Sequence, residues 1–307
     1  MSIHEEIVDA INAINGSHPG YRAVHARGTV YRGSFTATSE AAELSTAAHL
    51  QGDPVEATVR FSNASGNPKT SDANPLAGRG MAVKFHLPGD EATDLAMVPL
   101  PIFMVRNAED FLGFTRARLP DPETGQPDPE KLMAFVGEHP ETARALQLGL
   151  PALAPTTSFV TSAYNSLHAF ALVDSAGERH WGRWAFVPDG GVEHVPEGEL
   201  EGKARDYLTT ELAERLAAGP AAMTLQFTLA QDGDSLDDPT EPWEGEREVR
   251  DMGRLEVTEV IDEKEAGDPL VFDPTNLTDG IEPSDDKILA ARSPAYSVSI
   301  DRRMASS

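Results

Sequence analysis

The spacing of apolar residues near the start of the chain is helical. In the segment 3–15 the apolar positions recur three or four residues apart, as on one face of a helix: Ile7, Ala10, Ile11 and Ile14. Gly16 and Pro19 follow and end the pattern. We therefore predict an N-terminal helix over 3–15.

Short runs with the composition of β-strands occupy much of the remaining chain, and clusters of Gly, Pro, Asn or Asp bound them. They cover 21–30, 56–62, 80–86, 95–105, 166–172, 180–186, 223–230 and 255–262. Residues 106–150 have helical spacing broken by prolines into two or three pieces, and 203–218 predicts another helix. The acidic, proline-containing segment 231–250 is interpreted as a loop.

A last helix is predicted from Ser284 to Arg302. Ser284 is its expected N-cap, and Asp285 and Asp286 are expected in the first turn, where the helix dipole favours anions. The order of strands and helices is that of an α+β protein, and the number of strands suits an antiparallel barrel. We expect a single domain over 1–307: an N-terminal helix (1–16), a barrel with inserted helices (17–283) and the terminal helix (284–303).

Charge and composition exclude several function classes. The chain has 50 acidic and 25 basic residues, a net charge of −25, which disfavours nucleic acid and anionic membrane surfaces as partners. It has no cysteine, so disulfides, iron–sulfur clusters and thiolate metal ligands are excluded. The N-terminus has no signal-peptide pattern, and no run approaches the roughly 18 apolar residues of a membrane helix. A cytoplasmic location is therefore expected.

The predicted last helix holds the strongest candidate chemistry. At about 100° per residue, four polar residues fall on one stripe: Arg292, Tyr296, Ser299 and Arg303. Guanidiniums beside a phenol favour its phenolate form, which is a hard anionic ligand for ferric iron. The same spacing is also common around a buried tyrosine next to surface arginines, and Pro294 would kink the helix.

Near the other end, His25 stands in Arg22-Ala23-Val24-His25-Ala26-Arg27-Gly28. A histidine in an apolar strand is most often a core residue with its hydrogen bonds satisfied. Cleavage of a peroxide O–O bond, however, needs one base that accepts a proton and returns it, and histidine has a suitable pKa for this. These residues alone leave both readings open.

Several strings, taken together, resemble the catalase family. The run Phe272-Asp273-Pro274-Thr275-Asn276, continued by Gly280-Ile281-Glu282-Pro283, is similar to the family's stretch before its proximal helix. Arginines four residues before and seven after the tyrosine match as well. The resemblance implies a catalase-like antiparallel β-barrel with haem, of the b type, buried between the barrel and the C-terminal helix. It implies Tyr296 as the iron ligand, Arg292 as support for its phenolate, Arg303 on a haem propionate and Phe272 against the porphyrin.

The resemblance extends to the distal side of the haem. It implies His25 as the acid–base group, Ser62 as its hydrogen-bond partner, and Arg22 and Arg60 as further propionate partners. The strings Val59-Arg60-Phe61-Ser62, Gly78-Arg79-Gly80, Pro101-Ile102-Phe103 and Phe111-Leu112-Gly113-Phe114 follow in the family's order. Phe111 would stack on the haem, and His168 in Ser166-Leu167-His168 would lie near its edge.

The chain also departs from the family at several positions. Val98 stands where the family has an asparagine that completes the distal site, and Met104 replaces a second phenylalanine after Phe103. Because valine has no hydrogen-bond donor, we expect weak dismutation of hydrogen peroxide at most. Ser297-Val298-Ser299 replaces the proline and Asp-Thr that usually follow the tyrosine. The chain resembles the short, catalase-related peroxidases, so a monomer or homodimer is expected rather than an interlocked tetramer, and no bound NADPH is expected.

The leading prediction is a haem peroxidase that uses hydrogen peroxide or organic hydroperoxides to oxidise a small reducing substrate. One alternative is a catalase-fold isomerase or lyase of fatty-acid hydroperoxides, which Val98 and Met104 would suit. Another is a haem-binding protein with little turnover, against which the retention of both His25 and Ser62 argues. The three tryptophans, Trp181, Trp184 and Trp243, are expected to pack the barrel and loop; a role in electron relay is the less favoured reading.

Overall fold

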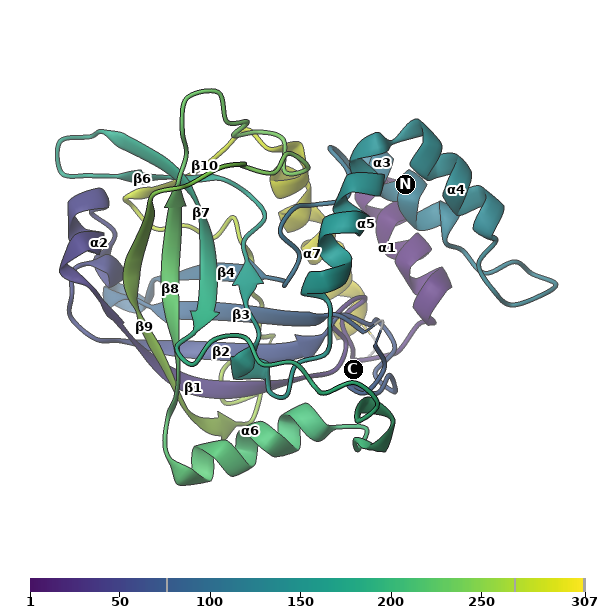
Figure 1. The fold of residues 1–307 in the computed structure, drawn as a ribbon, viewed down its shortest axis with the longest axis horizontal. Helices are drawn as coiled ribbons and strands as arrows, with labels where there is room; N and C mark the ends of the chain where they lie inside the picture. The colour runs from purple at the N-terminus through teal and green to yellow at the C-terminus, as the bar shows by residue number, and fades with distance from the viewer. Residues whose placement is uncertain (76, 268, 306–307) are drawn as a thin grey trace.

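The computed structural model of the protein describes residues 1–75, 77–267 and 269–305. Figure 1 shows a strongly curled sheet on one side and a group of helices, α1, α3, α4 and α5, on the other, with α7 between them. The helices are α1 (Ile3–Asn15), α2 (Ser39–Leu44), α3 (Ala108–Ala117), α4 (Pro129–Glu138), α5 (Pro140–Ala152), α6 (Tyr207–Ala218) and α7 (Lys287–Met304). Four 3₁₀ turns lie at Ala48–Leu50, Pro88–Asp90, Phe159–Thr161 and Leu200–Gly202.

The sheet is antiparallel throughout the described pairs. Its strands are β1 (Gly28–Ala37), β2 (Val55–Asn63), β3 (Arg79–His86), β4 (Ala92–Met97), β5 (Tyr164–Asn165), β6 (Phe170–Val173), β7 (Arg179–Pro188), β8 (Ala221–Leu229), β9 (Val249–Ile261) and β10 (Ile281–Pro283). They are ordered β10-β6-β7-β8-β9-β1-β2-β3-β4, with β5 paired to β7. A bridge between Val98 and Asn165 links the end of β4 to β5, so the curl brings distant strands together.

The inside of the curl holds the main hydrophobic core. Alternate residues of β7 and β8 are buried, as expected for strands with one face on a core. Large rings fill this space, among them Tyr31, Phe61, Trp184 and Phe227. The ring centres of Trp184 and Phe227 are 4.6 Å apart. The Nε1–H of Trp243 donates a hydrogen bond to the carbonyl oxygen of Ser235. Packing is thus the role that the structure gives these two tryptophans.

β2 is buried on both faces, and this places the candidate site. Val59 and Phe61 point into the core, whereas Arg60 and Ser62 point to the opposite face, because side chains alternate along a strand. That opposite face lines a cavity to which α1 and α7 also contribute residues. None of the helices in the described parts of the chain combines the length and hydropathy of a membrane span.

Most predicted elements agree with the structure. The N-terminal helix has the predicted bounds and begins with a capping box, in which Ser2 and Glu5 exchange side-chain and backbone hydrogen bonds. The region 108–152 forms three helices, and prolines lie near the breaks between them, as predicted. Several strands agree in place but not in length; β4, for example, ends at Met97.

Two predictions about the site's elements are wrong. The run 21–30 is not a strand up to Gly28: Tyr21–Arg27 is irregular, and His25 has a φ of 53°, in the left-handed region that a strand excludes. The N-cap of the last helix is Asp286, not Ser284, since Asp286 Oδ1 accepts the backbone N–H groups of Ile288 and Leu289 at 2.7 and 3.2 Å. Asp285 therefore precedes the helix instead of lying in its first turn.

Candidate active site

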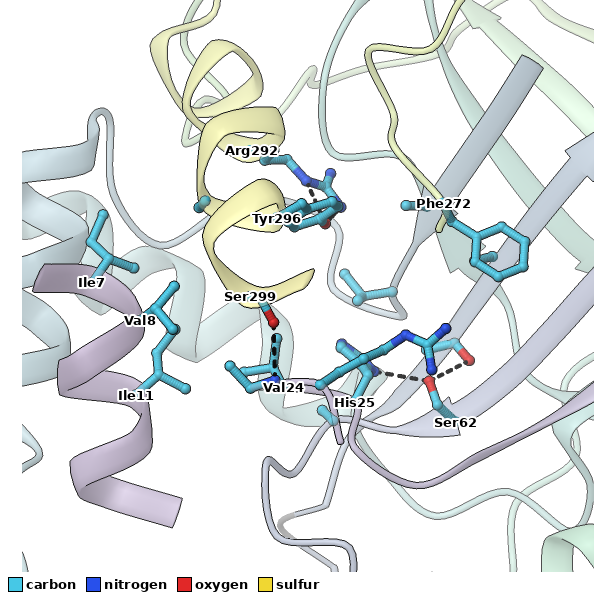
Figure 2. A pocket seen from close by; sticks show the side chains of 18 of the residues that line it. Ile7, Val8, Ile11, Val24, His25, Ser62, Phe272, Arg292, Tyr296 and Ser299 are labelled. Atoms are coloured by element: carbon cyan, nitrogen blue, oxygen red, sulfur yellow. Dashed lines mark hydrogen bonds between the residues drawn. The ribbon is translucent and has the colours of Figure 1, made fainter. Parts of the chain in front are cut away.

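A cavity of about 430 Å³ lies between the outer face of β2–β4 and the helices α1, α3 and α7. This size is in the range of small-molecule and cofactor sites. Nearly all the predicted site residues line it: Arg22, His25, Arg60, Ser62, Phe111, Phe272, Arg292, Tyr296 and Arg303. Figure 2 shows Tyr296 and Arg292 on α7 above His25 and Ser62, so that the two candidate reactive groups face one cavity from different elements.

His25 is held by one contact at its ring and one at its backbone. Its Nδ1 lies 2.9 Å from Ser62 Oγ, and Arg60 Nη2 donates to its carbonyl oxygen at 3.0 Å. Ser62 Oγ is also 3.5 Å from the carbonyl oxygen of Gly80, to which it can only donate. The hydroxyl is then free to accept the Nδ1–H of His25, which leaves Nε2 as the unprotonated nitrogen.

The charges around His25 favour its neutral form. Burial, together with the positive charges of Arg60, Arg292 and Arg22, lowers the pKa of His25 to about 3. A neutral imidazole is the form that accepts a proton, so the site keeps His25 available as a base.

Two glycines make room for these groups. A Cβ on Gly28 would lie 2.5 Å from the guanidinium carbon of Arg60, and a Cβ on Gly80 would lie 2.4 Å from Cε1 of His25. Both distances are far below van der Waals contact, so any larger residue would displace the side chain that it meets.

Tyr296 receives two hydrogen bonds from one guanidinium. Arg292, one turn earlier on α7, donates Nε and Nη2 to the phenol oxygen at 3.1 and 2.8 Å. Two charge-assisted donors on the same oxygen stabilise negative charge there. Pro294 does not interrupt α7, which is continuous from Lys287 to Met304, so Arg292, Tyr296, Ser299 and Arg303 all reach the cavity.

Three arginines that line the cavity, from distant parts of the chain, converge on the carboxylate of Glu263. Arg22 lies 2.6 Å from Glu263, and Arg60 and Arg303 each lie 3.8 Å from it. Burial opposes the charge of Glu263, but the hydrogen bond from Arg22 and the three positive charges outweigh it and hold its pKa below the usual value. Burial also lowers the pKa of Arg60 to about 9. The three guanidiniums thus hold the carboxylate of Glu263 in place.

His168 does not line the cavity but anchors the helix that does. Its Nδ1 lies 2.6 Å from Asp286 Oδ2, and both side chains are fully buried. Burial lowers the pKa of His168, against the opposing effect of its hydrogen bond to Asp286. Since Asp286 also caps α7, this pair fixes the start of the helix that presents Tyr296. From the sequence, Asp286 was expected only in the first turn of the helix.

The structure adds lining residues that the sequence did not single out. Ile7, Val8 and Ile11 bring the apolar face of α1 to the cavity (Figure 2), and Leu167, Leu270 and Arg118 also line it. The helical period of α1 predicted an apolar face but not what that face would cover. Val98 and Met104, the two departures noted in the sequence, are lining residues as well.

The comparisons with known proteins agree with this geometry. The sequence profile of the catalase family matches residues 5–307. The chain belongs to the catalase family. Among similar proteins, the catalase-related peroxidase of Mycolicibacterium paratuberculosis is 40% identical over 300 residues, covering 97% of this chain and 94% of that protein. The catalase-related peroxidase of Synechococcus elongatus is 35% identical over 302 residues, covering 97% and 88%.

Longer catalases match over part of their length. The catalase of Pseudomonas aeruginosa is 30% identical, covering 90% of this chain but 55% of that protein. A fungal catalase structure and catalase A from Saccharomyces cerevisiae superimpose with TM-scores of 0.82, at 22% and 21% identity. They cover 97% of this chain, and 62% and 64% of those chains, so this catalase-family chain has the fold of the catalase core.

The family's cofactor is haem, and the cavity has the features that haem binding needs. A haem combines an apolar macrocycle with two carboxylate arms. Phe111 and Phe272 supply apolar walls, Tyr296 supplies a phenol oxygen of the kind that ligates haem iron, and the arginines that surround Glu263 already hold one carboxylate in place. The residues that line the cavity therefore fit haem.

Proposed function

We propose that this catalase-family protein is a haem peroxidase, in which Tyr296 ligates the iron and His25 handles the peroxide. The observation that supports it most is the placement of two hydrogen-bonded pairs, Arg292 with Tyr296 and Ser62 with His25, on one cavity. Both similar relatives of matching length bear the name catalase-related peroxidase. The working unit is the whole chain, 1–307, as a single domain, with haem b as the cofactor.

The residues divide the work of holding the cofactor. Arg22, Arg60 and Arg303 would neutralise the two propionates, Phe111 and Phe272 would pack against the macrocycle, and Arg292 would hold the Tyr296 oxygen in place with two hydrogen bonds. His168 acts through Asp286 by fixing the start of α7. When bound, haem would supply the redox chemistry that couples reduction of the peroxide to oxidation of an electron donor.

His25 moves the proton that peroxide cleavage requires. Its Nε2 accepts the proton of the O–H oxygen of the hydroperoxide ROOH and returns it to the oxygen that carries R. That second oxygen then leaves as an alcohol, or as water when the substrate is hydrogen peroxide. Ser62 keeps the ring in the tautomer that can do this. Over the full cycle, ROOH, two electrons from the donor and two protons give ROH and water, so the residues of the chain end unchanged.

Val98 limits dismutation. It lines the cavity, and it offers no donor to a second hydrogen peroxide molecule. The haem-loaded protein should oxidise a dye donor with hydrogen peroxide and with cumene hydroperoxide, while it evolves little oxygen from hydrogen peroxide alone. Val98→Asn should raise oxygen evolution at least severalfold. Oxygen evolution at the rate of an ordinary catalase would refute the role of Val98, and no donor oxidation with any peroxide would refute the proposed function.

A second candidate function is isomerisation or cleavage of a fatty-acid hydroperoxide without a donor. The apolar lining by Val98, Met104 and the face of α1 favours it. Product analysis with a lipid hydroperoxide separates the two functions: an epoxide, allene oxide or aldehyde formed in the absence of donor supports the second, and an alcohol formed only with donor supports the first.

A further inference from the structure

Arg118 lines the same cavity as His25 and has no role in the functions assigned above. It is the C-cap residue of α3 and comes seven positions after Phe111, about 10 Å along the helix. Its side chain is half-buried. Its Nε donates to the carbonyl oxygen of Phe114 at 3.4 Å, and its guanidinium lies 4.2 Å from the centre of the Phe114 ring.

The described residues place no negative charge beside Arg118. Within the described parts of the chain, no carboxylate lies within ion-pair distance of its guanidinium, and no hydrogen bond reaches its two terminal nitrogens. Two residues earlier, the exposed Arg116 pairs with Glu6 at 2.7 Å. Acidic residues outnumber basic ones two to one, 50 against 25, so carboxylates are abundant elsewhere. Burial lowers the pKa of Arg118, which is the mark of a charge partly removed from water without compensation.

The surroundings of Arg118 are apolar. Phe114 belongs to a cluster with Val105 and Ile288, against which Phe103, Met104 and Phe111 pack. Several of these residues also line the cavity, and the α1 side chains in Figure 2 add another apolar wall. A ligand that satisfies this cavity is therefore apolar along its length and anionic at one end.

We propose that Arg118 binds the carboxylate of an organic hydroperoxide whose apolar chain extends through the cavity toward His25. The substrate class is that of fatty-acid hydroperoxides. This inference rests on the proposed function, because it names the peroxide that the same site reduces. A guanidinium presents paired N–H donors that match a carboxylate, and the apolar surroundings strengthen that pair. Hydrogen peroxide has neither a chain nor a carboxylate, so Arg118 contributes nothing to its binding.

The kinetic test compares linoleic acid hydroperoxide with its methyl ester and with hydrogen peroxide, using the haem-loaded protein. Arg118→Gln should raise KM for the acid about tenfold or more, the loss expected for a hydrogen bond to a charged group. KM for the ester and for hydrogen peroxide should change less than twofold. Arg118→Lys, which keeps the charge but not the paired donors, should retain part of the preference for the acid. Arg116→Gln is the matched control, since it removes the same charge from the exposed side of the same helix.

A binding test needs no turnover. Dodecanoate should bind the haem-loaded protein in calorimetry, and Arg118→Gln should weaken its binding by a similar factor while methyl dodecanoate is unaffected. Equal use of acid and ester by the parent, or equal dodecanoate binding by parent and Arg118→Gln, would overturn the role of Arg118. If no peroxide reacts with the parent, the proposed function fails, and dodecanoate binding still decides whether Arg118 holds a carboxylate.

Discussion

Gly80→Ala is the substitution that tests the distal geometry most directly. Gly80 lies on β3 opposite Ser62 of β2. An added Cβ would lie 2.4 Å from Cε1 of His25, 2.6 Å from its Nδ1 and 3.0 Å from Ser62 Oγ. The new methyl group would thus intrude on the hydrogen bond that orients the imidazole.

The size of the effect follows from these distances. Ordinary contact begins near 3.4 Å, so the ring must move by about 1 Å. The backbone of His25 cannot follow freely, because Arg60 binds its carbonyl oxygen and the strands fix Gly80. Misplacing a reacting group by about 1 Å costs about 100-fold in rate, and overpacking costs about 1–3 kcal/mol in the free energy of unfolding.

Stopped-flow mixing of the haem-loaded variant with hydrogen peroxide measures the rate, and urea unfolding measures stability. The ferric optical spectrum should stay close to that of the parent, since Tyr296 and Arg292 are untouched. Gly78→Ala is the control, because its Cβ would meet the flexible end of Leu153 at 3.1 Å and the Cβ of Ala64 at an ordinary contact distance of 3.6 Å. A folded, haem-loaded Gly80→Ala protein that reacts within twofold of the parent rate would refute the assignment of His25 as the proton-transfer group.

Three further predictions concern other parts of the site. Tyr296→Phe removes the oxygen that accepts both Arg292 hydrogen bonds, so the ferric optical spectrum of the haem-loaded protein should shift; an unchanged spectrum would exclude Tyr296 as the ligand. The pKa of His25, lowered to about 3, lies below the assay range, and protonation would inactivate the base, so the peroxide rate should vary less than twofold from pH 8 to pH 5; a rate that halves near pH 6.5 would contradict this. Glu263→Gln removes the carboxylate that competes for Arg22, Arg60 and Arg303, so haem titration of the cofactor-free protein should show tighter binding; weaker binding would mean that Glu263 organises the cluster instead.

The sequence by itself determined the features that depend on local periodicity. The first helix has its predicted bounds, because its apolar spacing, capping residues and terminal glycine all act within a few positions. The stripe of Arg292, Tyr296, Ser299 and Arg303 could be predicted for the same reason, since a helix fixes which residues share a face. The family resemblance added the expectation that this stripe would meet His25 and Ser62, which lie at the other end of the chain.

Only the tertiary structure decided how distant segments meet. His25 looked like a strand residue, but its left-handed backbone and its contact with Ser62, 37 positions away, depend on the turn into β1 and the register of β2. The convergence of three arginines on Glu263 and the covering of the cavity by α1 depend on the curl of the sheet and the packing of helices against it. Such contacts join residues that are far apart in the chain, so local sequence patterns do not predict them. Arg118 illustrates the same limit. Nothing in the sequence distinguishes it from the other arginines, and only the packing shows that it lines the cavity with no carboxylate of the described residues at ion-pair distance.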